Sequence, residues 1–288
     1  MNVPLRTLVA GRREGWLNFD EEMEKYSDSF PRPTGEERTH NSDLMLMYFT
    51  SGTSGYPKIA AHNFTYPLGH VITARHWQNV RDGGLHLSVS DTGWGKASWG
   101  KIYGQWLSEA TVFVYDYDSK FNPTEYLRVI EQYKVNVFCA PPTVFRFLIK
   151  ADIGHYDLSS LRHCCIAGEP LNAEVYNKWK QITGLELREG FGQSETAVLV
   201  ATYPWLDAKP GSTGRPSPHF RATLLDKDGN EVGPGEEGEI CIPTKDGHPA
   251  GLTLGYYKDK KNTDAVLHDG WYHTGDMAWA DSAGYWWF

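Results

Sequence analysis

Short apolar runs alternate with helix-like segments from about Asp43 to Arg188, and this alternation limits the fold more than any other feature of the chain. The apolar runs at 135–140 and 164–167 predict buried strands. Helix-like patterns follow Asn122 and Asn172, and each of these side chains can cap a first helical turn. Strands that alternate with helices predict a mainly parallel sheet with helices on its faces.

The pattern changes between Pro204 and Pro218, where Pro and Gly interrupt the chain and helix-like spacing disappears. Beyond this point, alternating apolar residues at 220–224 lead into the turn Asp228-Gly229, and 239–242 can form the return strand. The last part of the chain therefore predicts antiparallel β-structure.

A loop rich in Gly and hydroxyl residues, Thr50 to Lys58, follows the apolar run 44–49, which we expect to be a buried strand. The N–H groups of such a loop can bind phosphate oxygens, and Lys58 adds positive charge. An ordinary turn with a solvated lysine is the alternative. A P-loop does not fit, because Pro57 precedes the lysine and Ile59 follows it. The loop therefore predicts a phosphate-bearing ligand.

Three motifs in order resemble those of the adenylate-forming superfamily, which includes acyl-CoA synthetases, firefly luciferase and nonribosomal adenylation domains. They are the loop at 50–58, the segment Glu-Gly-Phe-Gly-Gln-Ser-Glu at 189–195 and the segment Trp-Tyr-His-Thr-Gly-Asp at 271–276. The segments 91–94 and 112–115 narrow the resemblance to the acetyl- and medium-chain acyl-CoA synthetases. The resemblance implies an α/β fold, a mainly parallel sheet with flanking helices, followed by a small antiparallel β-barrel-like subdomain.

The resemblance also implies a division of the chain near Asp207. Residues 1–207 would form the nucleotide- and acyl-binding part of a large domain, and residues 208–288 would form the β-barrel-like subdomain. Family members have further strands and helices before this segment and a mobile C-terminal domain after it, so we expect the chain to be a fragment. The aromatic residues at 285–288 favour the same interpretation, because a chain end rarely exposes so many rings.

The activity that the resemblance implies is that of an AMP-forming acid-thiol ligase. In the family, a carboxylate attacks the α-phosphorus of ATP to give an acyl-adenylate and pyrophosphate, and the thiol of CoA then displaces AMP. ATP, Mg²⁺ and CoA would be the cofactors, a small carboxylic acid the substrate, and the CoA site would lie largely on the absent domain. That domain also supplies a lysine for adenylation, so we expect this chain to bind nucleotide without completing catalysis. The alternatives are a non-catalytic ATP- or AMP-binding protein from a truncated gene and an adenylation domain that serves a carrier protein.

The resemblance assigns nucleotide contacts to residues of the motifs and of one further turn. The phosphates would be bound by Thr50, Ser51, Gly52, Thr53, Ser54, Gly55 and Lys58. The rest of the nucleotide would contact Gly168, Glu169, Pro170, Glu189, Gly190, Phe191, Gly192, Gln193, Ser194 and Asp276. The catalytic residues would be Thr53, Lys58 and Glu195.

Three of these assignments have a specific role and a simpler alternative. Glu195 would bind Mg²⁺ through its carboxylate, or it is a solvated loop residue. Asp276 would accept hydrogen bonds from the ribose hydroxyls, or it is an ordinary turn residue. Phe191 would stack on adenine, or it packs in the core.

The acyl pocket is where the chain departs from acetyl-specific relatives, which have a Trp just before the Gln of the second motif. Gly192 stands there instead, which implies an acyl group larger than acetyl, of medium chain length or branched. We expect Trp94, Gly95 and Trp99 to line this pocket together with Gly192 and Ser194, although aromatic residues in an α/β fold are more often part of the core.

Composition excludes two broad classes of function. The net charge of −8 and the lack of a basic cluster argue against a nucleic-acid surface. No apolar stretch is long enough for a membrane span, and residues 1–30 lack the apolar core of a signal peptide. The four cysteines include the adjacent pair Cys164 and Cys165 in an apolar run, so we expect buried thiols in a reduced, cytoplasmic protein. His163 beside them matches no zinc spacing.

Overall fold

The computed structural model describes residues 5–50, 57–90, 94–116, 120–169 and 171–288. The chain divides into two units, Met1–His40 and Asn41–Phe288. In the first unit, β1 (Thr7–Leu8) and β2 (Leu17–Asn18) pair in parallel, and α1 (Phe19–Met23) and η1 (Gly35–Glu37) are short. The first unit has no buried residue among those described, in keeping with its polar, irregular sequence.

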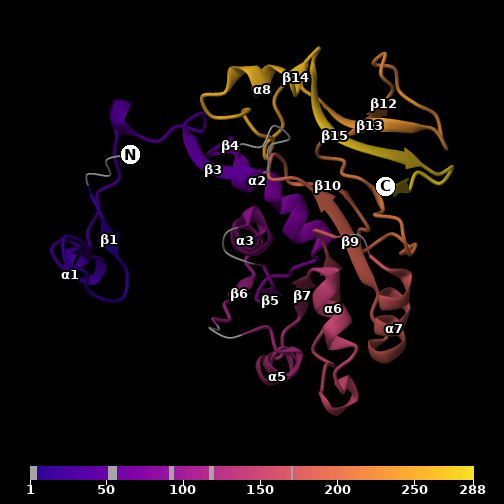
Figure 1. Ribbon diagram of the computed structural model, residues 1–288, viewed down its shortest axis with the longest axis horizontal. Coiled ribbons are helices and arrows are strands. Elements are labelled where there is room, and N and C mark those ends of the chain that lie inside the picture. The colour runs from indigo at the N-terminus through magenta and orange to yellow at the C-terminus, as the bar shows by residue number, and fades with distance from the viewer. Residues whose placement is uncertain (1–4, 51–56, 91–93, 117–119, 170) are drawn as a thin grey trace. The chain divides into compact units, whose positions relative to one another are not determined.

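A seven-stranded sheet, counted over the described residues, forms the centre of the larger unit (Figure 1). Five of its strands pair in parallel, in the order β6-β5-β7-β8-β9, while β10 and β11 join the β9 edge antiparallel. The mainly parallel sheet predicted from the sequence is thus confirmed. The strands are β5 (Leu85–Ser88), β6 (Thr111–Phe113), β7 (Val137–Ala140), β8 (His163–Ile166), β9 (Leu187–Gly192), β10 (Val198–Ala201) and β11 (Arg215–Pro216).

One layer of helices against this sheet consists of α5 (Pro123–Tyr133), α6 (Pro142–Leu148) and α7 (Ala173–Thr183). The predicted caps are present, because the Asn122 side chain accepts from Thr124 N and the Asn172 side chain accepts from Glu174 N. α7 ends at Gly184, whose φ of 74° is left-handed, as expected of a glycine that follows a helix. Local sequence signals therefore determine where these helices begin and end.

The other layer is built from shorter helical pieces, two of which are π-helical turns. They are α2 (Tyr66–Val71), η2 (Ile72–Trp77), α3 (Gly95–Ser98), η3 (Trp99–Tyr103) and α4 (Gly104–Leu107). α4 lies so close to α2 that a Cβ on Gly104 would be 2.1 Å from the carbonyl oxygen of His70. In the part of the chain that the structure describes, no helix has both the length and the apolar character required to cross a membrane.

Alternate residues of the central strands face the two layers, as strand geometry requires. Phe138 and Cys164 lie in the core beneath α5, α6 and α7, whereas Cys139 and Cys165 face the opposite layer, where Trp77 packs against them. Each of these side chains is fully buried. All four cysteines of the chain are buried free thiols, which confirms the expectation that they are buried and unpaired.

An antiparallel sheet of five strands, counted over the described residues, forms the remaining part of the larger unit (Figure 1). Its turns include the predicted Asp228-Gly229 and a second one at Asp269-Gly270, and the antiparallel β-structure expected here is confirmed. The division near Asp207 stays a prediction, although β11 lies beyond it and still belongs to the large sheet. The elements are β12 (Thr223–Leu225), β13 (Glu237–Pro243), α8 (Lys260–Asp264), β14 (Leu267–His268), β15 (Trp271–Ala280) and β16 (Trp286–Trp287).

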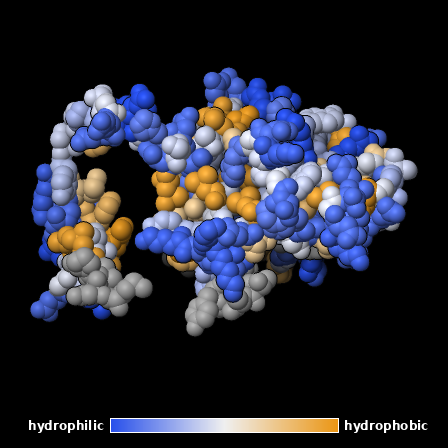
Figure 2. Space-filling view, turned by 90° about the horizontal axis from the view of Figure 1, so that it is seen from above, coloured by the Kyte–Doolittle hydropathy of each residue, from blue (hydrophilic) through white to orange (hydrophobic). Residues whose placement is uncertain are grey.

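The strand predicted at 44–49 is present as β3 (Leu44–Thr50), but the expectation that it is buried is wrong. It pairs antiparallel with β4 (Lys58–Asn63), a strand that the sequence analysis missed, and none of its residues is buried. Phe49 is 75% exposed, because within the described residues β4 is the only strand beside it and no layer covers its outer face. Figure 2 shows such apolar patches, in orange, among polar residues on one face of the molecule.

Candidate functional site

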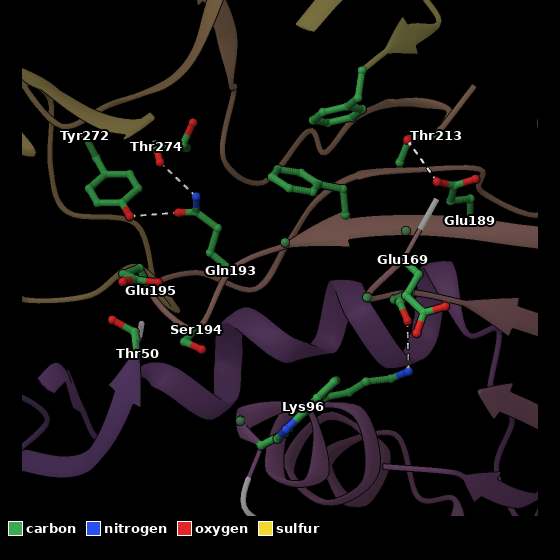
Figure 3. A pocket seen from close by; sticks show the side chains of 18 of the residues that line it. Thr50, Lys96, Glu169, Glu189, Gln193, Ser194, Glu195, Thr213, Tyr272 and Thr274 are labelled. Atoms are coloured by element: carbon green, nitrogen blue, oxygen red, sulfur yellow. Dashed lines mark hydrogen bonds between the residues drawn. The ribbon is translucent and has the colours of Figure 1, made fainter. Parts of the chain in front are cut away.

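The motif residues meet around one cavity of about 830 Å³ in the larger unit (Figure 3). It lies where β9 ends, between the two sheets, and the second motif forms much of its wall. All predicted site residues that the structure describes line this cavity, except Asp276. They are Thr50, Lys58, Trp94, Gly95, Gly168, Glu169, Glu189, Gly190, Phe191, Gly192, Gln193, Ser194 and Glu195.

Part of the predicted site lies outside the described residues. This applies to Ser51, Gly52, Thr53, Ser54, Gly55 and Pro170, and to the side chain of Trp99. The proposed phosphate loop is therefore represented in the structure by its two ends, which face each other as the register partners Thr50 and Lys58 of β3 and β4.

Gln193 joins the second motif to the third. Its Nε2 donates to the Thr274 carbonyl oxygen at 2.9 Å and to Asp276 Oδ2 at 2.6 Å, and its Oε1 accepts from the Tyr272 hydroxyl at 2.9 Å. Figure 3 shows the Gln193 amide held between Tyr272 and Thr274. Asp276 therefore does not line the cavity itself but is hydrogen-bonded to Gln193, which does. Tyr272, which was quoted only as part of the motif and given no role, lines the cavity and orients Gln193.

Glu195 is 8% exposed, so the alternative of a solvated loop carboxylate is wrong. Its Oε1 accepts from the Tyr256 hydroxyl at 3.1 Å, and the Tyr256 ring lies 4.6 Å from Lys58 Nζ. Burial, followed by the Glu195 charge, raises the pKa of Tyr256, so the hydroxyl stays protonated as the donor. Figure 3 shows Glu195 on the same side of the pocket as Thr50 and Ser194. No sequence signal singled out Tyr256.

Replacing Tyr256 with Phe is expected to lower the free energy of unfolding by about 1.5–3 kcal/mol, the range for a hydrogen bond to a charged group. The ring against Lys58 is kept, so the change removes only the bond to Glu195. Urea unfolding measures it, with Tyr257→Phe as the matched control because Tyr257 is 40% exposed. Equal stability of the two variants would show that the Tyr256 hydroxyl does not hold Glu195.

The opposite side of the cavity has its own polar groups. Burial raises the pKa of Glu189 to about 7, although hydrogen bonds from the Thr213 hydroxyl and the Leu171 backbone favour the ionised form. Lys96 is buried and donates from Nζ to the Ala167 carbonyl oxygen at 3.3 Å. An acid that titrates near neutrality and a buried cation thus line the same cavity. Neither Lys96 nor Thr213 was expected from the sequence.

His62 supports the second motif from β4. Its Nε2 lies 2.8 Å from the Ser194 carbonyl oxygen, and burial lowers the pKa of the imidazole to about 4. The ring is therefore neutral at pH 7 and donates a single N–H to that carbonyl. Because β4 was not predicted, the position of His62 beside the Ser194 backbone was not expected from the sequence.

The two glycines of the second motif allow close approach of neighbouring atoms. A Cβ on Gly190 would lie 2.5 Å from the Trp77 ring, and a Cβ on Gly192 would lie 2.4 Å from the Ala197 carbonyl oxygen. A larger residue at Gly192 would therefore require a shift of the backbone at the start of β10. Phe191 lines the cavity, packs on Phe288 with ring centroids 4.6 Å apart and also packs against the core of the antiparallel sheet, so both of its interpretations stay open.

The family model for AMP-binding enzymes matches residues 5–257, and the chain belongs to that family. The chain is 40% identical over 277 residues to acyl-coenzyme A synthetase ACSM3, mitochondrial, of Homo sapiens, across 96% of this chain and 46% of the relative. It is also 40% identical over 283 residues to 4-hydroxybutyrate–CoA ligase 1 of Metallosphaera sedula, across 98% of this chain and 48% of the relative. The chain thus spans about half the length of the curated relatives it matches.

Solved structures agree with this membership. An acyl-CoA synthetase of Brucella canis superposes with a TM-score of 0.85 at 27% identity, across 96% of this chain and 50% of that one. The anthranilate CoA ligase AuaEII, solved with anthranoyl-AMP, superposes with a TM-score of 0.86, across 98% of this chain and 53% of that one, and at 24% identity it supports the fold alone. The resemblance to adenylate-forming enzymes drawn from the motifs is confirmed.

Proposed function

We propose that this chain is the nucleotide- and acyl-binding part of an AMP-forming acyl-CoA synthetase. The observation that supports this most strongly is the single cavity in which residues of the first and second motifs meet, with Gln193 bonded to the third. Residues separated by up to 226 positions (276 − 50) thus occupy one region, as a composite ATP site requires.

ATP would lie along the second motif. Lys58 and the loop before it would bind the phosphates, and Asp276 would accept hydrogen bonds from the ribose hydroxyls. The Glu195 carboxylate and the Thr50 and Ser194 hydroxyls fit Mg²⁺, which prefers oxygen ligands. A bound Mg²⁺ neutralises phosphate charge.

The first half-reaction needs little from the protein beyond position and charge. The substrate carboxylate attacks the α-phosphorus of ATP in line with the leaving pyrophosphate, and the acyl-adenylate forms. The CoA thiol then attacks the acyl carbon and releases AMP. Lys58 stabilises negative charge on the phosphates, while the buried pair of Glu195 and Tyr256 keeps the carboxylate in place for the metal.

The acyl group would occupy the part of the cavity near Trp94 and Gly95, with Gly192 and Ser194 opposite. A medium-chain or branched acid is the proposed substrate class, since no indole precedes Gln193.

The division into residues 1–207 and 208–288 belongs to the same proposal, as does CoA as the acceptor. A cytoplasmic location is proposed from the four buried free thiols, which suit a reducing compartment. The human relative named above is mitochondrial by name, so a mitochondrial location is the alternative.

Calorimetry on the 288-residue chain tests nucleotide binding directly. Mg-ATP should bind, and the affinity should fall when Mg²⁺ is replaced by a chelator, because Glu195 would then face the phosphates without a cation. A folded sample that shows neither heat nor a thermal shift at millimolar Mg-ATP would contradict the proposal.

A series of non-hydrolysable acyl-adenylate analogues tests the acyl pocket without requiring turnover. Each buried methylene should add up to about 0.8 kcal/mol of binding free energy until the pocket is full. Butanoyl and hexanoyl analogues should therefore bind more tightly than the acetyl analogue. If acetyl binds best, Trp94 or another wall residue already closes the pocket.

A further inference from the structure

Three metal-binding side chains converge on the antiparallel sheet, outside the cavity. Cys241 of β13 lies directly opposite His273 of β15, and Glu239 lies two residues before Cys241 on the same face of its strand. One ligand atom from each residue lies within 4.8 Å of the others. His273 Nδ1 is 2.8 Å from Glu239 Oε2 and 3.5 Å from Cys241 Sγ.

These separations are close to those between the ligands of a tetrahedral zinc ion. Zinc binds oxygen, nitrogen and sulfur at about 2.0–2.3 Å, which places neighbouring ligand atoms roughly 3.3–3.7 Å apart. The 3.5 Å between His273 Nδ1 and Cys241 Sγ falls in this range, whereas the 2.8 Å between His273 Nδ1 and Glu239 Oε2 would have to lengthen. A thiolate and an imidazole together favour zinc over Mg²⁺ or Ca²⁺, which take oxygen ligands.

Without a metal ion, the Glu239 carboxylate accepts from His273 Nδ1 and from the Cys241 thiol, so one acceptor joins the three groups. A cation between the three atoms would replace both of these hydrogen bonds. The His268 ring stacks on the His273 ring at 4.1 Å between centroids and limits its rotation. The other ring nitrogen, Nε2, is buried without a hydrogen-bond partner among the described residues.

An ion can reach this cluster from solvent. Cys241 is fully buried, while the side chains of His273 and Glu239 are 20% and 28% exposed. Glu239 uses its second oxygen, Oε1, to accept from Gly275 N at 2.8 Å. The cluster is therefore bonded to the turn that leads to Asp276.

We propose that Glu239, Cys241 and His273 form a zinc site, with water as the fourth ligand. Cys241 binds as the thiolate and its proton passes to solvent. Zinc held by Glu239 Oε2 leaves the bond from Gly275 intact, so the ion stiffens the turn before Asp276. The site does not depend on the proposed ligase function, since it is built on a different face of β13 and β15.

Metal titration of the chelator-treated 288-residue chain tests the site. Calorimetry with Zn²⁺ should show one ion per chain, and Cys241→Ser and His273→Gln should each weaken binding at least tenfold, roughly the effect of losing even a supporting group. Co²⁺ should give a thiolate-to-metal charge-transfer band that Cys241→Ser abolishes.

Matched controls are Cys139→Ala and His155→Ala, which remove a thiol and an imidazole elsewhere and should leave Zn²⁺ affinity unchanged. The proposal is overturned if the unsubstituted chain binds no Zn²⁺, or if both site variants bind it as tightly as the unsubstituted chain does. Should the site variants fail to fold, the Co²⁺ spectrum of the unsubstituted chain decides, because a spectrum without the charge-transfer band excludes Cys241 as a ligand.

Discussion

Replacing Trp77 with Ala is expected to lower the free energy of unfolding by about 3–5 kcal/mol, the range for deleting a buried indole. The side chain is fully buried, packs against Cys139 and Cys165 beneath the large sheet, and donates from Nε1 to the Arg188 carbonyl oxygen at 3.2 Å. Its ring also lies directly under Gly190. Loss of the indole would leave a cavity in the core and would also remove the ring that packs against Gly190 of the second motif.

Denaturant unfolding followed by circular dichroism measures this loss. Trp106→Ala is the matched control, because that indole is 65% exposed and its loss should change stability by less than about 1 kcal/mol. A Trp77→Ala chain that unfolds at the same denaturant concentration as the control would mean that the core relaxes to fill the space.

Asp276→Ala is expected to weaken Mg-ATP binding by about 1.5–3 kcal/mol, or roughly 10- to 150-fold in Kd. The carboxylate would lose its bonds to the ribose hydroxyls, and Gln193 would lose one of its two acceptors. The Gln193 amide keeps its bonds to Tyr272 and Thr274, so the cavity wall should stay in place.

Calorimetric titration with Mg-ATP is the measurement. Asp246→Ala, an exposed turn residue of the same part of the chain, serves as the control and should bind as the unsubstituted chain does. An unchanged affinity for Asp276→Ala, with the fold intact, would show that Asp276 is an ordinary turn residue that accepts from Gln193 and does not bind nucleotide.

Much of the α/β part was predictable because its signals are local. The helices after Asn122 and Asn172 begin at caps that the side chains make with their own first turns, and Gly184 ends the second helix through its left-handed backbone. The predicted apolar runs 135–140 and 164–167 correspond to the buried strands 137–140 and 163–166, which differ from them by one or two residues at the ends. The π-helical turns η2 and η3 were not predicted, and neither begins at a side-chain cap.

The strand β4 shows what local patterns miss. Lys58–Asn63 contains a charged residue, a histidine and an asparagine, so its composition does not predict a strand. It forms one because its backbone pairs with β3 and because Ala61 N bonds to the Gly255 carbonyl oxygen, nearly two hundred residues away. The pairing with β3 is close in sequence, whereas the contact with Gly255 is long-range and lies outside any short window of sequence.

The candidate site likewise has a part that the sequence indicated and a part that only the structure shows. The identity of the motif residues and their order along the chain were enough to indicate an adenylate-forming enzyme, because that chemistry needs phosphate, metal and ribose contacts of particular residue types. The sequence could not show that Tyr256 holds Glu195, that His62 holds the Ser194 backbone, or that Glu239, Cys241 and His273 meet across two strands. These contacts join residues of different elements, and their distances depend on strand register and on how the two sheets pack. The sequence by itself therefore determined the family and the chemical groups, whereas tertiary packing decided which side chains hold those groups in place.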